Sequence, residues 1–353
     1  MAMNEQTASM PVHHGARVLP AVTVEGYNAE LRDRDGYLGD RANDRAFRDI
    51  IEELRSRIRE VDEDPLGDAG PDLGKKKLDK ALEKGSLEAK GVIQAAIEAF
   101  SQEFANVIRR FLELEAWRGT EHIVVGGGLS WSRVGELVTA RTAVALKTAG
   151  ISVGFSRIRH PSDEAGLVGA VQLTPAWTLE GFDGILAVDI GGTKMRAGIV
   201  RLNLEKEPAF RAACVWKNEV WRHADERPTR DEAVGKLTDM LRDLVRKAAK
   251  HELRLAPFIG IGCPGMIRED GCIDRGGQNL PGNWETDSFN LPRRILDALP
   301  SIGGRAAAVV MHNDAVVQGL SEAPFMRGLA RWGIFTIGTG LGNAVFANRP
   351  GKG

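Results

Sequence analysis

The spacing of apolar residues predicts long helices in the first half of the chain. Residues 44–60 have a helical pattern, and residues 88–114 place large apolar side chains three or four positions apart, as expected of one helix face. The members of this stripe are Ile93, Ile97, Phe100, Phe104, Ile108 and Phe111. A continuous stripe of this kind is more typical of a helix facing a core than of a binding groove.

Short apolar runs predict strands around these helices. Residues 16–26 are rich in Val and Leu and indicate a strand, for which Pro20 favours an edge position. The stretch HIVVGGGLS at 122–130 predicts a strand and a glycine turn, and an amphipathic helix follows to about residue 149. The start of that helix is a candidate ligand-facing position.

Another strand, helix and linker end the first half. Residues 151–158 predict a strand, residues 163–173 a closely packed helix because Ala and Gly are frequent, and residues 174–182 a linker. In the second half, apolar runs occur at 186–200, 258–267, 306–320 and 333–349. The first and last of these runs have the pattern of hairpins with glycine turns, and they look like counterparts.

The composition is that of an ordinary globular protein. With 353 residues, 43% hydrophobic and 27% charged, the chain has room for two lobes that each bury a core. The 47 basic and 48 acidic residues give a formal charge of −1, so no overall field favours nucleic acid or an anionic membrane. Cys214, Cys263 and Cys272 lack paired spacing, which argues against a disulfide framework and indicates a reducing cytoplasm.

Two polar stretches of the first half concern localisation and surface chemistry. The first residues lack a basic start followed by an apolar core, and no run reaches the ~18 apolar residues of a membrane span, so we expect neither export nor insertion. Residues 62–86 mix Pro, Gly and charge and predict a surface connection with one short helix. Its run Lys75–Lys77 is a candidate phosphate contact, although a solvated face is the commoner role.

The first hairpin, LAVDIGGTKMRAGIV, carries candidate chemistry for phosphate. Asp189 is expected where the first strand meets the turn, and the turn residues 191–194 combine two glycines, a hydroxyl and a cation. Glycine lets the backbone approach a phosphate closely. The carboxylate of Asp189 is a candidate Mg²⁺ ligand, directly or through water, because Mg²⁺ takes only one or two protein carboxylates. An ordinary glycine-rich hairpin is the alternative interpretation.

The second hairpin contains IGTGLGN, which matches a dinucleotide-binding loop only in part. Asn343 occupies the position of the last glycine, and the following AVFANR is strand-like rather than helical. A second hairpin that embraces phosphate fits this stretch better. The motif GxxxxGK[ST] does not occur in the sequence, so a P-loop NTPase is not supported.

Two further stretches offer groups that could act on a hydroxyl or bind a polyol. HNDA follows an apolar run, which predicts Asn313 and Asp314 at the end of a buried strand and the start of a helix. A carboxylate there can accept a hydroxyl proton while the neighbouring amide orients the hydroxyl, but a helix cap is an equally common role. GQNLPGNW offers the amide of Asn279 and the flat face of Trp284 for a polyol; a plain turn anchored by a buried Trp is nearly as common.

Taken in order, DIGGTKMRAGIV, GIGCPGMI, NLPGNW, NDA and GTGLGNAV resemble the ROK family of sugar kinases and sugar-responsive regulators, part of the actin-like ATPase superfamily. These segments cover most of residues 184–349. The resemblance implies a two-lobe α/β fold of the actin-like ATPase (ribonuclease H-like) type. It also implies ATP and Mg²⁺ as cofactors and phosphoryl transfer to a hydroxyl of a hexose or amino sugar.

The order of the segments resembles a circular permutation of that family. HIVVGGGLS and DEAGLVGAVQL resemble its adenosine-binding end, which ordinarily comes last and here comes first. Residues 16–26 are then the candidate third strand of the C-terminal lobe, and we predict that residues 343–349 pair with residues 16–24. The expected division is residues 16–160 with 328–353 as the C-terminal-type lobe, residues 161–327 as the N-terminal-type lobe, and residues 1–15 as a flexible start.

The resemblance implies a role for each candidate residue. Asp314 is implied as the general base, Asn279 and Asn313 as amides that orient the sugar, and Asp189 as the organiser of Mg²⁺. The residues implied around the ATP phosphates are Gly191, Gly192, Thr193, Lys194, Gly338, Thr339 and Gly340. The residues implied near adenosine are Gly126, Gly127 and Gly128.

The sequence departs from the family in one respect. The family's zinc motif of one His and three Cys, which follows the third strand, has no match, so no structural zinc is expected. The Glu and His that accompany this motif and contact the sugar have no clear counterpart. His13, His14 and Glu25 lie in about the right region, although a lone His is more often a surface or packing residue.

The main alternative is a sugar-sensing regulator or a non-catalytic relative, because the family contains both. The sequence shows neither a helix-turn-helix head before residue 16 nor a basic recognition helix. Retention of both hairpins and of Asp314 favours an enzyme. We expect no nucleic-acid or membrane partner, and the resemblance implies a homodimer.

Overall fold

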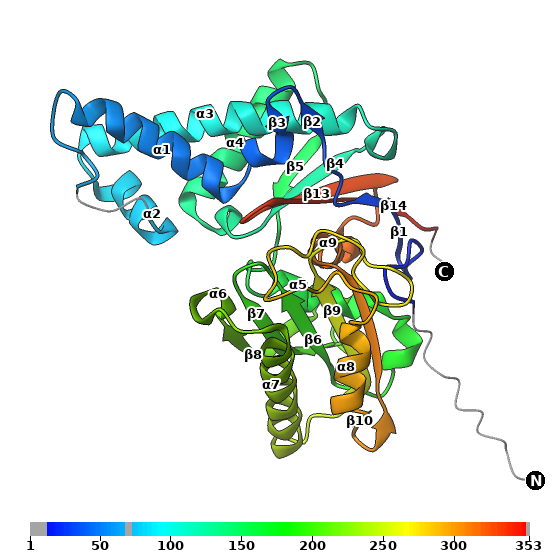
Figure 1. Ribbon diagram of the computed structural model, residues 1–353. Helices are drawn as coiled ribbons and strands as arrows, with labels where there is room; N and C mark the ends of the chain where they lie inside the picture. Colours follow the sequence, from blue (N-terminus) through cyan, green and yellow to red (C-terminus); the bar gives the residue numbers. More distant parts are fainter. Residues whose placement is uncertain (1–12, 68–72, 351–353) are drawn as a thin grey trace, which may run out of the picture. The chain divides into compact units, whose positions relative to one another are not determined.

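The computed structural model describes residues 13–67 and 73–350 (Figure 1). Contacts divide these residues into two units, and each is described by itself. Unit 1 comprises residues 13–20 and 167–317, and unit 2 comprises residues 21–67, 73–166 and 318–350. Of the start expected to be flexible, residues 1–12 lie outside the described residues. Within residues 13–15, the N–H of Gly15 donates to the carbonyl of Met311 at 2.9 Å.

Unit 1 is built on a five-stranded sheet in the order β12-β9-β6-β7-β8. Strands β6, β7 and β8 are antiparallel neighbours, and β9 and β12 extend the sheet parallel to β6. The strands are β6 (Gly184–Ile190), β7 (Met195–Arg201), β8 (Cys214–Trp221), β9 (Leu255–Cys263) and β12 (Ala308–Asn313). A two-stranded hairpin pairs β10 (Ser301–Ile302) with β11 (Arg305–Ala306).

The helices of unit 1 cover both faces of this sheet. They are α6 (His223–Glu226), α7 (Arg230–Lys250) and α8 (Leu291–Ala298), with α5 (Ala165–Gly169) and α9 (Asp314–Leu320) at the unit boundaries. Single turns of 3₁₀ helix occur at Ala170–Leu173, Ala176–Leu179, Pro208–Phe210 and, in unit 2, at Ala323–Phe325.

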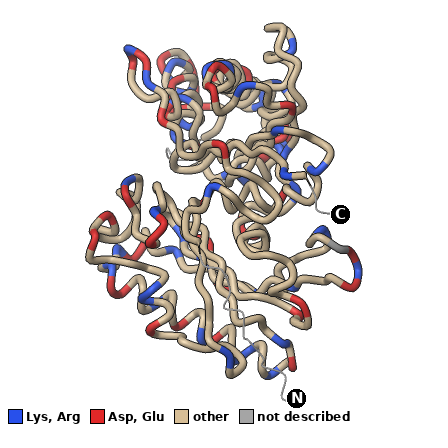
Figure 2. The backbone as a smooth tube through the Cα atoms, turned by 90° about the vertical axis from the view of Figure 1, so that its right-hand side faces the viewer, with Lys and Arg blue, Asp and Glu red and all other residues tan. Residues whose placement is uncertain are grey.

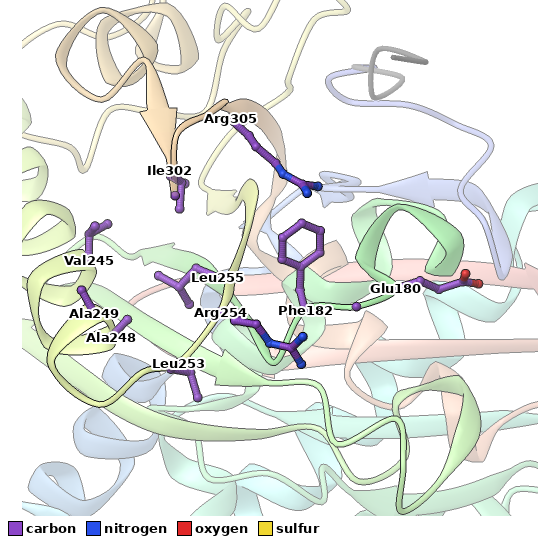
Figure 3. A pocket seen from close by; sticks show the side chains of 12 residues that line it. Glu180, Phe182, Val245, Ala248, Ala249, Leu253, Arg254, Leu255, Ile302 and Arg305 are labelled. Atoms are coloured by element: carbon purple, nitrogen blue, oxygen red, sulfur yellow. The ribbon is translucent and has the colours of Figure 1, made fainter. Parts of the chain in front are cut away.

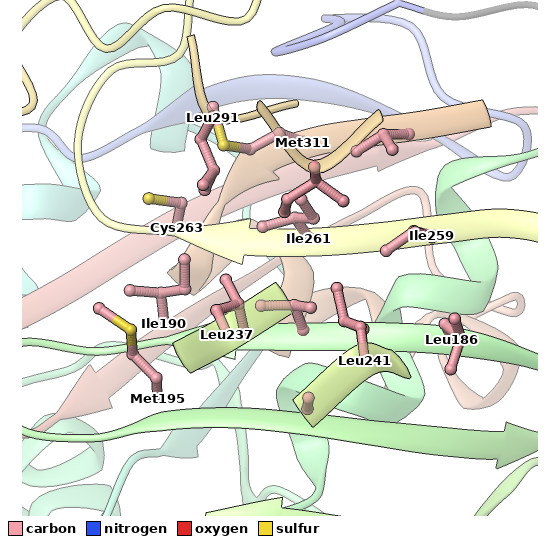
Figure 4. Close-up of a cluster of buried hydrophobic side chains, with 14 of the residues drawn as sticks. Leu186, Ile190, Met195, Leu237, Leu241, Ile259, Ile261, Cys263, Leu291 and Met311 are labelled. Atoms are coloured by element: carbon pink, nitrogen blue, oxygen red, sulfur yellow. The ribbon is translucent and has the colours of Figure 1, made fainter. Parts of the chain in front are cut away.

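The central strand β6 is buried over its whole length. Leu186 and Ile190 pack with Leu237 and Leu241 of α7 in one core (Figure 4). On the opposite face, a Cβ atom on Gly260 of the adjacent strand β9 would lie 2.8 Å from the Cβ of Ala170, so this glycine permits a close approach. Both faces are therefore covered, which explains why β6 is apolar almost throughout.

Unit 2 contains a second five-stranded sheet, in the order β1-β14-β13-β4-β5. Strands β13, β14 and β1 are antiparallel neighbours, and β4 and β5 extend the sheet parallel to β13. The strands are β1 (Val22–Tyr27), β4 (His122–Gly126), β5 (Gly154–Arg157), β13 (Arg331–Ile337) and β14 (Leu341–Asn348). A small hairpin pairs β2 (Arg32–Asp33) with β3 (Gly36–Tyr37).

The helices of unit 2 include the long helix that the apolar stripe predicted. They are α1 (Asp44–Arg59), α2 (Lys75–Lys84), α3 (Leu87–Leu112) and α4 (Arg133–Thr148), with 3₁₀ turns at Leu38–Arg41, Glu115–Trp117 and Leu129–Trp131. All six stripe residues of α3 are buried. Phe104 and Phe111 meet Phe335 of β13 edge to face, with ring centroids 5.8 and 5.0 Å apart, so the stripe faces the core.

The predicted pairing between the two ends of the chain is confirmed for residues 22–24. Val22 lies opposite Asn348 and Val24 opposite Phe346, and β1 is an edge strand. For residues 16–20 the prediction is wrong, because this segment belongs to unit 1, where the carbonyl of Ala16 is 3.2 Å from Nε2 of His312. Pro20 is the last residue of this unit 1 segment, and it has no backbone N–H to donate to the hydrogen bonds of a β-sheet.

The two sheets share one order when the strands of unit 2 are counted from β13. In unit 1 the strands in sequence are β6, β7, β8, β9 and β12, and the sheet order is third-second-first-fourth-fifth. In unit 2 the series β13, β14, β1, β4 and β5 gives the same order, with the same antiparallel and parallel neighbours.

Candidate functional site

The turn of the first hairpin lies between β6 and β7 in unit 1. The N–H of Gly191 donates to the carbonyl of Lys194 at 2.9 Å and closes the turn. Nε2 of His223 donates to the carbonyl of Gly191 at 2.8 Å, and the N–H of Ala224 donates to the carbonyl of Thr193 at 3.3 Å. The short helix α6 therefore holds the turn. His223 could not be recognised from local sequence, because it lies about 30 residues away from the turn it supports.

Asn279 lies against this turn. A Cβ atom on Gly192 would be 3.1 Å from the Cβ of Asn279, so the two residues are in close contact. The Asn279 residue itself is exposed. The structure thus brings together two candidate residues that are far apart in the sequence.

Asp189 is buried at the end of β6 and is paired with a residue that the sequence analysis missed. Nη1 of Arg196, which lies opposite on β7, donates to Oδ2 of Asp189 at 3.0 Å. The side chain of Asp189 is 4% exposed and that of Arg196 is 13% exposed. Cross-strand register could have revealed this pair, because a two-residue turn places these positions opposite each other.

Asp314 begins α9, directly after β12, and its backbone lies near the carboxylate of Asp189. A Cβ atom on Gly262, in the strand between them, would lie 3.5 Å from Cα of Asp314 and 3.6 Å from Oδ1 of Asp189. Burial first, and the negative charge of Asp189 second, raise the pKa of Asp314 to about 7. Burial and the same two carboxylates also raise the pKa of the Cys263 thiol. A carboxyl group with such a pKa is suited to accept a proton near neutral pH.

Asn313 is buried and caps the helix that Asp314 begins. Its Oδ1 accepts from the N–H groups of Ala315 and Val316 at 3.0 and 3.3 Å, and its Nδ2 donates to the carbonyl of Gly265 at 3.0 Å. The capping role that the sequence left open is therefore observed. These bonds fix the backbone on either side of Asp314.

Trp284 is buried, and the three residues matched to sugar contacts, His13, His14 and Glu25, do not lie in one unit. Trp284 is 1% exposed and donates from Nε1 to the carbonyl of Pro281 at 2.6 Å, so it anchors a turn and offers no face to a ligand. His14 is buried, which lowers its pKa, and its Nδ1 accepts from the N–H of Met311 at 3.1 Å. His13 is exposed in the same unit, whereas Glu25 is a residue of β1 in unit 2.

In unit 2 the two predicted nucleotide turns lie side by side. Strands β4 and β13 are parallel neighbours, with Gly126 opposite Thr336, so the turns at their carboxyl ends meet. Gly127 has a φ of +83° and packs so closely that a Cβ atom would lie 2.2 Å from the carbonyl oxygen of Ile337. The N–H of Gly338 donates to the carbonyl of Gly340 at 3.1 Å, which shapes an exposed glycine turn.

The described residues of unit 1 offer Mg²⁺ one or two carboxylates rather than a full set of protein ligands. Among the described residues, no three His, Cys, Asp or Glu side chains cluster as a metal cage. Mg²⁺ commonly uses one or two carboxylates with water and substrate phosphates, and Oδ1 of Asp189 beside Asp314 suits that mode. The other oxygen of Asp189 is engaged by Arg196.

A cavity of about 430 Å³ in unit 1 lies away from these residues (Figure 3). It is lined by Phe182, the end of α7 and the start of β9, whereas Asp189 and Asp314 lie at the carboxyl ends of their strands. Leu255, in its lining, is the first residue of β9 and Cys263 the last. The length of the strand therefore separates this cavity from the candidate site.

The charged residues of both units are mixed in sign along the chain. Figure 2 shows Lys and Arg interspersed with Asp and Glu rather than gathered in one stretch. Within the described residues, no helix combines the length and apolarity required to cross a bilayer.

Neither a protein-family model nor a curated protein matches the sequence. Similar solved structures include a protein of Listeria monocytogenes provisionally named as an N-acetylmannosamine kinase, with 23% identity and a TM-score of 0.35 over 47% of each chain. Another is a ROK hexokinase from Thermus thermophilus, with 22% identity and a TM-score of 0.32 over 48% of this chain and 49% of that one. The matched part spans about half the length of each relative, and a likeness of this extent does not assign a function.

Proposed function

We propose that this protein is an ATP-dependent sugar kinase built on a circularly permuted actin-like ATPase fold. The observation that carries the proposal is the meeting, in unit 1, of a carboxyl group with a pKa of about 7, a second carboxylate and a glycine hairpin turn. Asp314, Asp189 and the turn at Gly191 provide these three features. General-base catalysis beside a phosphate-binding turn is what phosphoryl transfer to a hydroxyl requires.

The permutation is supported by strand order. The sheet of unit 2 repeats the order of unit 1 only if β1 is counted after β14, although β1 precedes β14 by more than 300 residues. The side chain of Asn343 in β14 links this strand to the residues that follow β1. Its Nδ2 donates to the carbonyl of Ala29 at 3.1 Å, and its Oδ1 accepts from the N–H of Ala29 at 3.0 Å. A chain whose ends were moved into the connection between these strands would have this arrangement.

In the proposed reaction, Asp314 accepts the proton of a sugar hydroxyl as the hydroxyl oxygen attacks the γ-phosphorus of ATP. The bond from this phosphorus to the bridging oxygen breaks, and ADP leaves. Burial first, and the charge of Asp189 second, raise the pKa of the base to about 7, which suits proton transfer near neutral pH. Asn313 holds Asp314 through the helix cap and the bond to Gly265, with its remaining amide hydrogen assigned to the sugar.

The other candidate residues contribute binding. We assign the exposed amide of Asn279 to sugar hydroxyls, and the backbone N–H groups and side chains of Gly192, Thr193 and Lys194 to the ATP phosphates. The turns at 126–128 and 338–340 of unit 2 are assigned to adenosine and phosphates. Mg²⁺, when bound, neutralises phosphate charge, and Asp189 is its proposed protein ligand.

A coupled assay of ADP release tests the proposal. Purified protein receives ATP, Mg²⁺ and one sugar at a time from glucose, mannose, N-acetylglucosamine, N-acetylmannosamine, fructose and allose. We expect sugar-dependent release that falls at least 10³-fold in Asp314→Ala. Asp297→Ala, which removes an exposed carboxylate of α8 in the same unit, is the matched control and keeps full activity. Equal turnover in Asp314→Ala and the control removes Asp314 from the mechanism.

The Arg196–Asp189 ion pair favours one second candidate, a sugar sensor without turnover. An arginine on the proposed Mg²⁺ ligand competes with the metal, as expected of a chain that binds sugar but transfers nothing. A sugar-induced rise in Tm without ADP release from any sugar would support the sensor. Release of ADP that depends on sugar would exclude it.

A further inference from the structure

The cavity at the end of α7 is bounded by apolar side chains that the core of unit 1 leaves partly uncovered (Figure 3). Val245 and Leu253 pack against this core but stay half-buried, and Ile302 of the β10–β11 hairpin completes the wall. The remaining apolar lining comes from Ala248, Ala249 and Leu255. A volume of about 430 Å³ lies in the range of small-molecule sites, which are largely apolar with a few polar groups.

Two arginines line the cavity beside Phe182, and a carboxylate balances the charge of one of them (Figure 3). Arg254 donates from Nε and Nη2 to the two carboxylate oxygens of Asp183 at 3.1 and 2.8 Å. The guanidinium group of Arg305 instead lies over the ring of Phe182, 5.2 Å from the ring centroid. Arg305 is exposed, and within residues 13–67 and 73–350 no carboxylate pairs with its guanidinium group.

The lining contains one carboxylate, that of Glu180. In Figure 3 the Glu180 side chain points away from Phe182, so it does not balance the charge of Arg305. A guanidinium group presents its N–H donors in a planar fork that matches the two oxygens of a carboxylate. An apolar wall beside such a group favours a ligand with an apolar body and one anionic end.

We propose that this cavity binds an amphipathic carboxylate, an organic acid whose carboxylate pairs with Arg305 and whose aliphatic body lies against Val245, Leu253 and Ile302. Each CH₂ group that leaves water at this wall favours binding, and the ion pair fixes the orientation of the ligand. The assignment does not depend on the proposed kinase activity. The cavity adjoins the amino end of β9, whereas Asp189 and Asp314 lie at the carboxyl ends of their strands.

Isothermal titration of the full chain with octanoate, below the concentration at which it forms micelles, tests this assignment. Octanol, which lacks the charge, and acetate, which lacks the apolar body, are the matched probes. We expect octanoate to bind at one site, octanol to bind about tenfold more weakly and acetate not to bind, because the ion pair and the apolar contact both contribute. Arg305→Met is expected to weaken octanoate binding about tenfold and to leave octanol binding unchanged.

Two further variants locate the binding site. Arg293→Met removes an exposed arginine of α8 in the same unit, outside the lining, and is expected to leave octanoate binding unchanged. Ala249→Leu adds bulk at an exposed position of α7 that lines the cavity, and is expected to abolish octanoate binding. Its free energy of unfolding stays close to that of the unaltered protein, because alanine and leucine both favour a helix.

The possible results decide the assignment. Absence of saturable octanoate binding overturns it, and so does equal octanoate affinity in Arg305→Met and the unaltered protein. An equal loss in Arg293→Met shows a general charge effect, and unchanged binding in Ala249→Leu shows that octanoate binds elsewhere on the chain; both overturn the assignment. Conversion of a dimer to a monomer in Ala249→Leu, measured by light scattering, would show that a second copy of the chain occupies the cavity instead.

Discussion

Replacement of Asp314 by asparagine is expected to stabilise the protein while removing activity. The carboxyl group has a pKa of about 7 in the folded chain against an ordinary value of 3.8, because burial and Asp189 disfavour its charge. Above pH 7 the carboxyl group is ionised in both the folded and the unfolded state, and the folded state bears the full free-energy cost of the buried charge. Below pH 3.8 the group is neutral in both states, and this free-energy cost is absent.

The size of the effect follows from these two values. At 1.36 kcal/mol per pH unit, the interval from 3.8 to about 7 corresponds to about 4 kcal/mol. Residual contact of Asp314 with solvent reduces this to about 2–3 kcal/mol. Asparagine has no charge to bury, so the variant gains this free energy of unfolding at pH 8. For a unit of this size, the gain corresponds to a rise in Tm of about 5–10 °C.

The assay is thermal unfolding of the unaltered protein and Asp314→Asn between pH 4 and pH 8.5. The difference in Tm is expected to grow from pH 4 to about pH 7 and then to remain constant. Asp297→Asn, at an exposed position on α8, serves as the control and shows no such growth. A difference that is the same at pH 5 and pH 8, or a variant less stable at pH 8, would refute a raised pKa at Asp314.

Three further outcomes are expected. With Asp314 as base, kcat/KM measured by ADP release rises about tenfold per pH unit below pH 7 and then levels; a flat profile from pH 5 to pH 8 contradicts this. Arg196→Met removes the Nη1 donor and the positive charge of the arginine from Asp189, so the Mg²⁺ concentration for half-maximal ADP binding falls several-fold in calorimetric titration. An unchanged value removes the competition argued above. Gly127→Ala places a Cβ atom 2.2 Å from the Ile337 carbonyl oxygen and is expected to lower the free energy of unfolding in urea by about 2–4 kcal/mol. The control Gly150→Ala, at a φ of +80° with open space around it, lowers this free energy by only about 1 kcal/mol. Equal losses in the two variants would show that the close contact of Gly127 with Ile337 contributes nothing.

The local parts of the candidate site could be predicted from the sequence. Asp189 at the end of a strand, the glycine turn after it, and Asn313 and Asp314 at a strand-to-helix junction each depend on a few consecutive residues. Periodicity likewise placed the α3 stripe in the core. The pairing of β1 with β14 was predicted from a family pattern rather than from local sequence.

The remaining parts depend on contacts between distant residues. His223 reaches the Gly191 turn from another element, and the position of Lys75 at Gly128 depends on how α2 packs on the start of α4. Composition cannot distinguish a lysine held in this way from its solvated neighbours. Trp284 illustrates the opposite case, because an aromatic residue in a turn motif can serve a ligand or a core, and here it is buried against Phe289 with ring centroids 5.1 Å apart.

The pairing of β1 with β14 also sets an order on synthesis. The sheet of unit 1 comes from one continuous stretch, Gly184 to Asn313, which can assemble once that stretch has left the ribosome. The sheet of unit 2 needs both β1 (Val22–Tyr27) and β14 (Leu341–Asn348), which are separated by more than 300 residues. During translation β1 therefore remains without its partner strand until those intervening residues have been made, exposed to pairing with other chains.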